Sequence, residues 1–387
     1  MIRSRHDCDI DGDNPVSPHR IALVTLIQVV AVILILSSAA CLRAPTQWAV
    51  VTVPSGVHPA SLTSSPEGLF VGGTKEVSGR VGPVLLLYRA GVWMQIPLHP
   101  KSGYGHSAAL VQLSVSGSQI VAIGDVTGGA HLNPRWSIWV GDIAGLDEQP
   151  QGMETFGGED GGNLNGIVAA PTPMIVGNYS ISTSQIGVAV WTNSDALWTR
   201  PPLPPEVTGS AGDQTSSAAT SSLAEATVVV GLAAPVSSAT PAFHATAWLF
   251  RAGAWRRVEF GPANSAALSV SCGPNRCLVT GLIDQKLALW SLTEDGKITT
   301  IAMPPLTVPL TSHGPHTNIS GNQGVVISPV EEGQSRAFSY DTRSQSLRKL
   351  PDPPAIPEQL AIVGTTVYIL TAPQSHERSA AIFSLTS

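Results

Sequence analysis

Histidine is the residue type in this chain best suited to binding a transition metal, because imidazole nitrogen is a common ligand for zinc and copper. His313 and His316 lie close together in a Ser-His-Gly-Pro-His segment, and three further histidines occupy other connections: His58, His99 and His106. If the fold gathers these side chains at one rim, they form a binding surface. The competing interpretation, which we favour over a metal site, is that they are ordinary histidines of exposed loops. We retain the five as candidate binding residues.

Two acidic residues lie in a glycine-rich stretch, residues 157–163. Glu159 and Asp160 are followed by Asn163, and oxygen ligands on an adaptable backbone suit calcium. The ligands are few and have no ordered spacing, so a solvated glycine loop is the favoured interpretation. We keep Glu159 and Asp160 as candidate binding residues and assign neither a metal nor another cofactor.

The first twenty residues contain a second acidic pattern. Asp7, Asp9, Asp11 and Gly12 resemble the first half of an EF-hand calcium loop, but the bidentate acid expected at the twelfth position would be Pro18. We therefore predict that residues 1–20 are a short cytoplasmic tail.

Cys272 and Cys277 flank the four-residue turn Gly-Pro-Asn-Arg, between two short apolar runs. Facing positions across so tight a hairpin lie within reach of a disulfide, and an oxidising compartment would form it. A metal or redox pair would need additional Cys or His ligands at fixed spacing, and the sequence lacks them. We expect a disulfide between these two cysteines.

Motifs of several enzyme classes are missing from the sequence. There is no Gly-x-Ser-x-Gly elbow, no His-Glu-x-x-His and no phosphate-binding loop. The nearest string to a sialidase Asp box, which begins at Thr293, has its glycine misplaced and lacks the tryptophan. An acid/base pair drawn from distant segments remains open, since such sites leave no local motif. We assign no catalytic residue.

Composition excludes one class of partner. The formal net charge is −6, only 12% of residues are charged, and no run of Lys or Arg occurs. A protein that binds nucleic acid needs a basic surface. We therefore expect no nucleic-acid partner, and we expect a monomer.

Residues 21–40 form an apolar run ending in small residues, with Arg3, Arg5 and Arg20 before it. This pattern is typical of an export signal or a transmembrane anchor, with the basic side in the cytoplasm. Residues 38–41, Ser-Ala-Ala-Cys, resemble a bacterial lipobox, which implies lipidation of Cys41, although Ser38 stands where that motif usually has Leu. We expect the chain after Cys41 to face outward, held at the cell membrane by an anchor or a lipid.

Residues 84–97 predict two strands joined at Arg89-Ala90-Gly91, because two apolar segments flank a glycine turn. Variants of this hairpin recur. Short apolar runs close at seven positions, 52, 53, 54, 50, 47 and 43 residues apart: Gly72, Gly124, Gly177, Gly231, Gly281, Ser328 and Thr371. Each is followed by a second run with an aromatic residue: Tyr88, Trp139, Trp191, Trp248, Trp290, Phe338 and Phe383. We interpret these aromatics as packing between repeats.

A period of 40 to 50 residues with four short strands is typical of a β-propeller. Seven units predict seven blades over residues 47–387. The last unit has three strands, and residues 48–54 have the pattern of an outer strand, so this N-terminal strand should complete the last blade and close the ring. The fold class is therefore all-β, a seven-bladed propeller preceded by one membrane or signal helix.

The unit at residues 340–351, Tyr-Asp-Thr-Arg-Ser-Gln-Ser-Leu-Arg-Lys-Leu-Pro, is similar to the kelch repeat, with Leu347 where kelch usually has Trp. The first unit adds the double glycine Gly72-Gly73, then Tyr88 and Trp93. The resemblance implies a propeller and no particular activity.

Residues 205–224 are rich in Ser, Thr, Gly and Ala. Such a stretch buries little apolar area, so we predict a mobile low-complexity insertion. For the whole chain we expect a membrane-tethered, extracytoplasmic propeller that binds or scaffolds a protein or a cell-wall glycan. The alternatives are a secreted glycosidase or lyase with a site built from loops, and a structural envelope protein.

Overall fold

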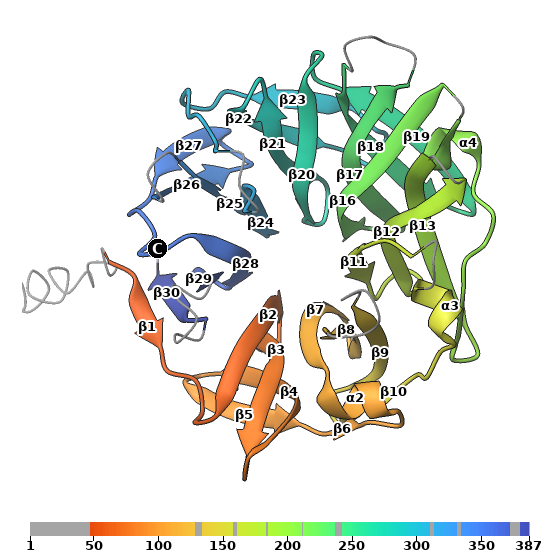
Figure 1. The fold of residues 1–387 in the computed structure, drawn as a ribbon. Coiled ribbons are helices and arrows are strands. Elements are labelled where there is room, and N and C mark those ends of the chain that lie inside the picture. The colour runs from red at the N-terminus through yellow and green to blue at the C-terminus, as the bar shows by residue number, and fades with distance from the viewer. Residues whose placement is uncertain are drawn as a thin grey trace, which may run out of the picture. The chain divides into compact units, whose positions relative to one another are not determined.

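A computed structural model of the chain describes residues 47–127, 134–157, 161–182, 185–210, 212–236, 242–309, 313–330, 334–371 and 380–386. They all belong to one compact unit, Pro45–Ser387. Seven antiparallel sheets are arranged in a ring around a central axis (Figure 1). The predicted all-β, seven-bladed propeller is confirmed. The predicted tail and membrane helix, residues 1–40, and Cys41 lie outside the described residues.

Each blade is listed from its inner to its outer strand. Blade 1 contains β2 (Val57–Ser65), β3 (Gly68–Val77), β4 (Arg80–Arg89) and β5 (Val92–Ile96). Blade 2 contains β7 (Ala109–Ser116), β8 (Gln119–Val126), β9 (Arg135–Asp142) and β10 (Gly145–Glu148), with β6 (Leu98–His99) parallel to β10. Blade 3 contains β11 (Leu164–Val168), β12 (Met174–Ser182), β13 (Gln185–Ser194) and β14 (Leu197–Thr199).

Blade 4 contains β16 (Asp213–Leu223), β17 (Ala226–Pro235), β18 (His244–Arg251) and β19 (Ala254–Phe260), with β15 (Gly209–Ser210) paired to the start of β16. Blade 5 contains β20 (Ser265–Cys272), β21 (Cys277–Ile283), β22 (Lys286–Leu292) and β23 (Ile298–Ile301). Blade 6 contains β24 (His316–Ser320), β25 (Gln323–Pro329), β26 (Ser335–Asp341) and β27 (Ser346–Lys349). Blade 7 contains β28 (Pro357–Val363), β29 (Thr366–Thr371), β30 (Ile382–Thr386) and β1 (Ala49–Val51). Helices α2 (Gly103–Ser107), α3 (Met153–Phe156) and α4 (Pro205–Thr208) connect blades.

The ring closes through β1, the N-terminal strand. It pairs antiparallel with β30, with Ala49 opposite Ser384 and Val51 opposite Ile382. This pairing gives the last blade its fourth strand and removes an open sheet edge at the seam. The predicted closure by the N-terminal strand is therefore confirmed.

The hairpin predicted from residues 84–97 is formed by β4 and β5. Ala90 and Gly91 have φ angles of 50° and 82°, the left-handed pair that a tight two-residue hairpin turn requires. Tyr88 pairs across the strands with Trp93, and their ring centroids are 4.6 Å apart. The equivalent aromatics of blades 2 to 5 are almost fully buried: Trp139, Trp191, Trp248 and Trp290. These residues belong to the core, as the sequence predicted.

Close contact between neighbouring strands explains why a glycine closes most of the apolar runs. In blade 4, Gly231 pairs with Ser217, where the register of β16 shifts before Ala219. A Cβ atom at Gly231 would overlap the carbonyl oxygen of Ser216. The bulge brings the inner strand so close to its neighbour that only glycine fits. Gly177 in blade 3 and Gly281 in blade 5 repeat the arrangement with the carbonyl oxygens of Asn163 and Ala266. In blade 1 the equivalent glycine is Gly73, where a Cβ would overlap the His58 carbonyl oxygen. Gly124 in blade 2 has the equivalent register, but a Cβ there would overlap the Ser137 hydroxyl.

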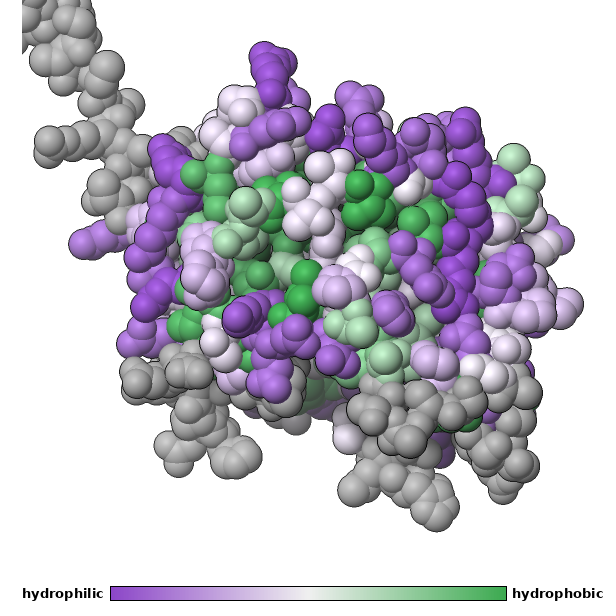
Figure 2. Space-filling view, turned by 90° about the horizontal axis from the view of Figure 1, so that it is seen from above, coloured by the Kyte–Doolittle hydropathy of each residue, from purple (hydrophilic) through white to green (hydrophobic). Residues whose placement is uncertain are grey.

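The apolar core lies between neighbouring blades. One cluster joins blades 4 and 5 through Val228, Val230, Val279 and Trp290, and similar clusters join the other blades. Figure 2 shows the outer side of the propeller, where hydrophobic patches alternate with hydrophilic borders.

The prediction of a mobile insertion at residues 205–224 is wrong. These residues form α4, β15 and β16, and β16 is the inner strand of blade 4, paired with β17 from Asp213 to Leu223. Its hydroxyls hydrogen-bond inside the protein: Thr215 Oγ1 donates to the Val207 carbonyl at 2.8 Å and Ser217 Oγ to the Gly177 carbonyl at 3.0 Å. Polar side chains are therefore compatible with order in this strand.

Candidate functional site

The inner strands of all seven blades surround a cavity of about 480 Å³ on the propeller axis. The strands are β2, β7, β11, β16, β20, β24 and β28. Each is the inner edge strand of its sheet, although β16 also pairs briefly with β15, and side chains of neighbouring blades bond some of the main-chain groups along these edges. Unpaired strand edges expose main-chain N–H and C=O groups. The cavity therefore combines main-chain donors and acceptors with the side chains of seven strands.

The described lining of this channel is uncharged. It contains hydroxyl groups, amides and aliphatic side chains, and it contains no Asp, Glu, Lys or Arg. The polar members are Thr63, Ser64, Gln112, Ser114, Ser116, Asn165, Thr220, Ser221, Ser222, Ser269, Ser271, His316, Thr317, Asn318 and Gln359. A channel of this kind suits an uncharged, hydrogen-bonding ligand better than a charged one.

Many of these polar groups, and the buried Ser61, hydrogen-bond the neighbouring blade. Ser61 Oγ in blade 1 donates to the Leu110 carbonyl at 2.7 Å, and Gln112 Nε2 in blade 2 donates to the Leu164 carbonyl at 2.8 Å. Asn165 Nδ2 continues the series to the Ser217 carbonyl at 2.7 Å. The acceptors lie next to the bulges, where main-chain groups lose their sheet partners.

The series continues through the remaining blades. Ser221 Oγ accepts from Cys272 N at 3.1 Å, Ser269 Oγ accepts from Thr317 N at 3.2 Å, and Asn318 Nδ2 donates to the Leu360 carbonyl at 3.2 Å. From blade 1 to blade 7, each pair of neighbouring blades is thus joined by a side-chain to main-chain bond beside the channel, and Ser61, which supplies the first of them, is buried behind the cavity lining. Thr63, Ser64 and Ser116 line the same cavity and take no part in these bonds.

Gln359 completes the ring at the seam. Its Oε1 accepts from Leu62 N in blade 1 at 2.7 Å, and its Nε2 lies 3.3 Å from the Val111 carbonyl in blade 2. One side chain of the last blade therefore bonds the first two blades.

His316 is the one titratable side chain of the described lining, apart from the disulfide-bonded Cys272. Burial, and then the nearby His313, lowers its pKa from 6.5 to about 4, while a hydrogen bond with Pro357 acts in the opposite direction. His316 is therefore neutral near pH 7, so the channel carries no formal charge there.

The structure does not bring the five candidate histidines together. His58 is exposed on β2, His106 is exposed on α2, and His99 on β6 has its Nδ1 3.6 Å from Asp147 Oδ1. Only His313 and His316 influence each other. Among the described residues, no three His, Cys, Asp or Glu side chains are placed to hold a metal ion. Glu159 and Asp160 lie outside the described residues.

Cys272 and Cys277 form a disulfide with an S–S distance of 1.99 Å. The two residues face each other at the end of β20 and the start of β21. Cys272 also contributes to the channel wall.

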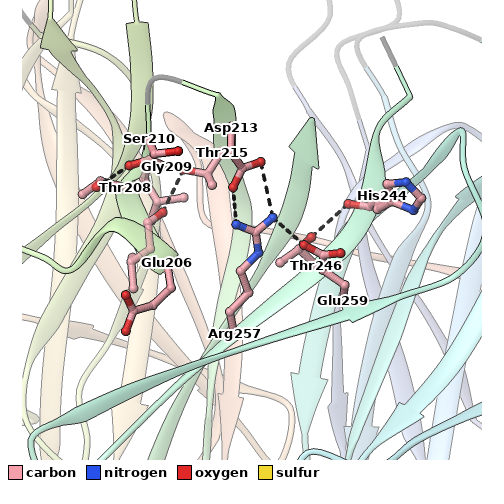
Figure 3. Close-up of polar contacts among 12 residues, drawn as sticks. Glu206, Thr208, Gly209, Ser210, Asp213, Thr215, His244, Thr246, Arg257 and Glu259 are labelled. Carbon is pink, nitrogen blue, oxygen red and sulfur yellow. Dashed lines mark hydrogen bonds and ion pairs between the residues drawn. The ribbon is translucent and has the colours of Figure 1, made fainter. Parts of the chain in front are cut away.

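A partly buried ion-pair cluster lies in blade 4 (Figure 3). The Arg257 guanidinium binds Asp213 on the inner strand, and its Nη2 lies 2.5 Å from Glu259 Oε1. Burial acts to lower the pKa of Arg257, but the bonds and charges of Asp213 and Glu259 raise it overall. With its charge compensated, Arg257 stabilises the blade and is not a free ligand-binding cation.

The amide residues of the wall were not predicted from the sequence: Gln112, Asn165, Asn318 and Gln359. A pattern that could have indicated them exists, since polar residues recur about once per repeat on the inner strands.

No helix in the described part of the chain has the length and apolar character needed to cross a membrane.

Comparison with known proteins supports the fold. No protein-family model matches the chain, and no curated protein matches it. The kelch resemblance therefore stays a prediction. Among solved structures, the β-propeller domain of the Trilobed protease from Pyrococcus furiosus is 11% identical, with a TM-score of 0.52, and the match covers 86% of this chain and 94% of that one. That domain is described as having an open velcro topology, whereas β1 pairs with β30 here.

Two peptidases are similar in the same way. A puromycin-hydrolyzing peptidase of Mycobacterium tuberculosis is 12% identical with a TM-score of 0.52, and the match covers 88% of this chain and 54% of that one. The acylaminoacyl peptidase of Pyrococcus horikoshii is 12% identical with a TM-score of 0.51, covering 88% and 53%. The chain thus spans about half the length of these peptidases. At such identities the likeness shows a shared propeller fold.

Proposed function

We propose that this protein is a binding module whose central channel takes an extended, uncharged segment of a partner protein. The observation that supports this most is the wall of the channel, where seven strand edges and their hydroxyl and amide side chains meet without a formal charge. Main-chain groups at a sheet edge pair well with the main chain of an extended peptide. The cavity of about 480 Å³ lies in the size range of ligand-binding sites.

A neutral cell-wall glycan is the second candidate ligand, because sugar hydroxyls can use the same donors and acceptors. The described lining has no aromatic side chain on which a sugar ring would stack, so a protein segment is the better match. The wall residues also argue against a glycosidase there, which would use a pair of carboxyl groups in its site.

Selectivity for uncharged ligands tests this proposal. The full-length protein, in a non-ionic detergent, is titrated with a labelled pool of Gly/Ser/Thr/Asn/Val decapeptides, with matched pools carrying Asp or Lys, and with an array of neutral oligosaccharides. We expect saturable binding of the uncharged peptide pool and weaker binding of both charged pools. Preference for a charged pool contradicts the proposal, and binding of oligosaccharides alone replaces the protein partner with a glycan.

We further propose that residues 21–40 hold the propeller on the outer side of the membrane, as an uncleaved helix or through a lipid on Cys41. The support is the apolar run with arginines before it. Labelling cells with a fatty-acid analogue distinguishes the two routes, since Cys41→Ala removes the label only if this cysteine is lipidated. Recovery of the protein in the soluble fraction contradicts tethering.

A further inference from the structure

A second cavity, of about 390 Å³, lies away from the channel, between blade 3 and the segment that leads to blade 4. It is bounded by the end of β12, the start of β13 and the segment that leads from β14 to α4. Its size is that of a small-ligand site.

One wall of this cavity is apolar. Val188 and Ala189 are buried beneath it, and Leu203, Pro201 and Pro202 form the side toward α4. Ile181 is 39% exposed at the rim, and Ile186 on the same hairpin is 49% exposed. An exposed isoleucine at the rim of a cavity with an apolar wall favours contact with an apolar group.

The other wall carries a positive charge. The Arg200 guanidinium carbon lies 3.5 Å from the centroid of the Tyr179 ring, a cation–π arrangement. Tyr179 is itself fixed, since it is buried and its ring packs edge-on against Trp191 with centroids 6.0 Å apart. The aromatic ring therefore holds Arg200 in one place at the cavity.

Arg200 differs from the other arginines that the structure places in fixed contacts. Arg89, Arg251, Arg257 and Arg336 each pair with a carboxylate, whereas within the described residues Arg200 has no ion pair. A planar guanidinium with five donors matches a carboxylate by two parallel hydrogen bonds. Among the described residues, no carboxylate occupies the donors of Arg200.

We propose that this pocket binds a small amphiphile that carries one carboxylate. The carboxylate bonds to Arg200, and the apolar body lies against Ile181, Pro202 and Leu203. This site is independent of the channel and adds a second ligand class, a small organic acid, to the binding module proposed above.

The test uses phenylbutyrate and its uncharged analogue phenylbutyramide, with the full-length protein in a non-ionic detergent and binding followed by ligand-observed NMR. We expect saturable binding of phenylbutyrate, and Arg200→Gln to weaken it by about tenfold or more, since it removes a charge-assisted pair of hydrogen bonds. Arg200→Lys should retain part of the affinity, and Ile181→Ser should weaken binding of the acid without abolishing it.

The matched control is Arg348→Gln, an exposed arginine on β27 in blade 6. It should bind phenylbutyrate as the unaltered protein does. Equal affinity for the amide, unchanged binding by Arg200→Gln, or no saturable binding would each overturn the proposal. None of these variants changes a residue of the channel. Failure of this proposal is therefore distinguishable from failure of the proposal that the channel binds a peptide segment.

Discussion

Gln359 in the last blade donates a hydrogen bond to the Val111 carbonyl, two blades further around the ring, with an Nε2–O distance of 3.3 Å. The same side chain accepts from Leu62 N in the blade between them. Ring closure therefore has two parts: β1 completes the outer side of the last blade, and Gln359 joins the inner strands at the channel. The inner bond lies at the proposed ligand site, so closure and binding share residues.

Replacing Gln359 by Leu should destabilise the protein by about 1–3 kcal/mol, because it leaves main-chain groups at the bulges of blades 1 and 2 without partners. The measurement is urea unfolding of the full-length protein in detergent, followed by tryptophan fluorescence. The matched control is Gln95→Leu on the outer strand β5, because the Gln95 side chain is exposed and accepts a hydrogen bond from Lys75. Its cost should stay within about 0.5 kcal/mol. Equal losses in the two variants would show that Gln359 has no special role.

Gly231→Ala should cost at least about 2 kcal/mol, since the added Cβ would overlap the Ser216 carbonyl and force β16 away from β17. Gly212→Ala is the control, because a Cβ there meets no atom within 4 Å. Thermal unfolding of both variants gives the comparison. A Gly231→Ala protein as stable as the control would mean that the bulge can relax.

Reduction of the Cys272–Cys277 disulfide should lower stability by about 2 kcal/mol, the loop-closure contribution for so short a loop. Thermal unfolding is recorded with and without a thiol reductant. The double variant Cys272→Ala/Cys277→Ala should not respond to reductant, which separates this bond from the two N-terminal cysteines. A protein whose unfolding temperature ignores the reductant would contradict the expected contribution.

Acid should destabilise the propeller through His316. Its folded-state pKa of about 4 lies below the ordinary 6.5, so the unfolded chain takes up the proton first and stability falls as the pH drops from 6.5 toward 4. The full effect is about 3 kcal/mol, with 1.4 kcal/mol for each pH unit. Urea unfolding across this range should show a smaller loss for His316→Gln than for the unaltered protein. The exposed His58→Gln should behave as the unaltered protein, and parallel curves for all three would rule out His316 as the cause.

The sequence was sufficient to predict the blades because the packing imposes a visible pattern. Gly72, Gly124, Gly177, Gly231 and Gly281 recur because a Cβ at each would overlap a neighbouring strand or side chain. The buried aromatics recur because each fills the space between blades. The spacing of these two residue types gave the number of blades. We predicted that the N-terminal strand closes the ring because the last unit has only three strands.

The channel wall was not predictable in the same way. Asn165 bonds Ser217, 52 residues away, and such partners become neighbours only when the ring exists. The hydroxyl-rich β16 was mistaken for an insertion because its side chains satisfy main-chain groups of adjacent blades, which a local pattern cannot reveal. The candidate histidines stay apart because the fold distributes them over blades 1, 2 and 6: His58 lies on β2, His99 on β6 and His316 on β24.

The central claim is that the channel itself holds the ligand, and Ser64→Trp tests it directly. Ser64 lines the cavity and bonds no neighbouring blade, so an indole there should occupy the space and leave the fold intact. Ser344→Trp, in the exposed turn between β26 and β27, is the matched control. The measurement is the affinity of the uncharged decapeptide pool for the three proteins. We predict a loss of about tenfold or more for Ser64→Trp alone; equal affinities for all three proteins would contradict the account.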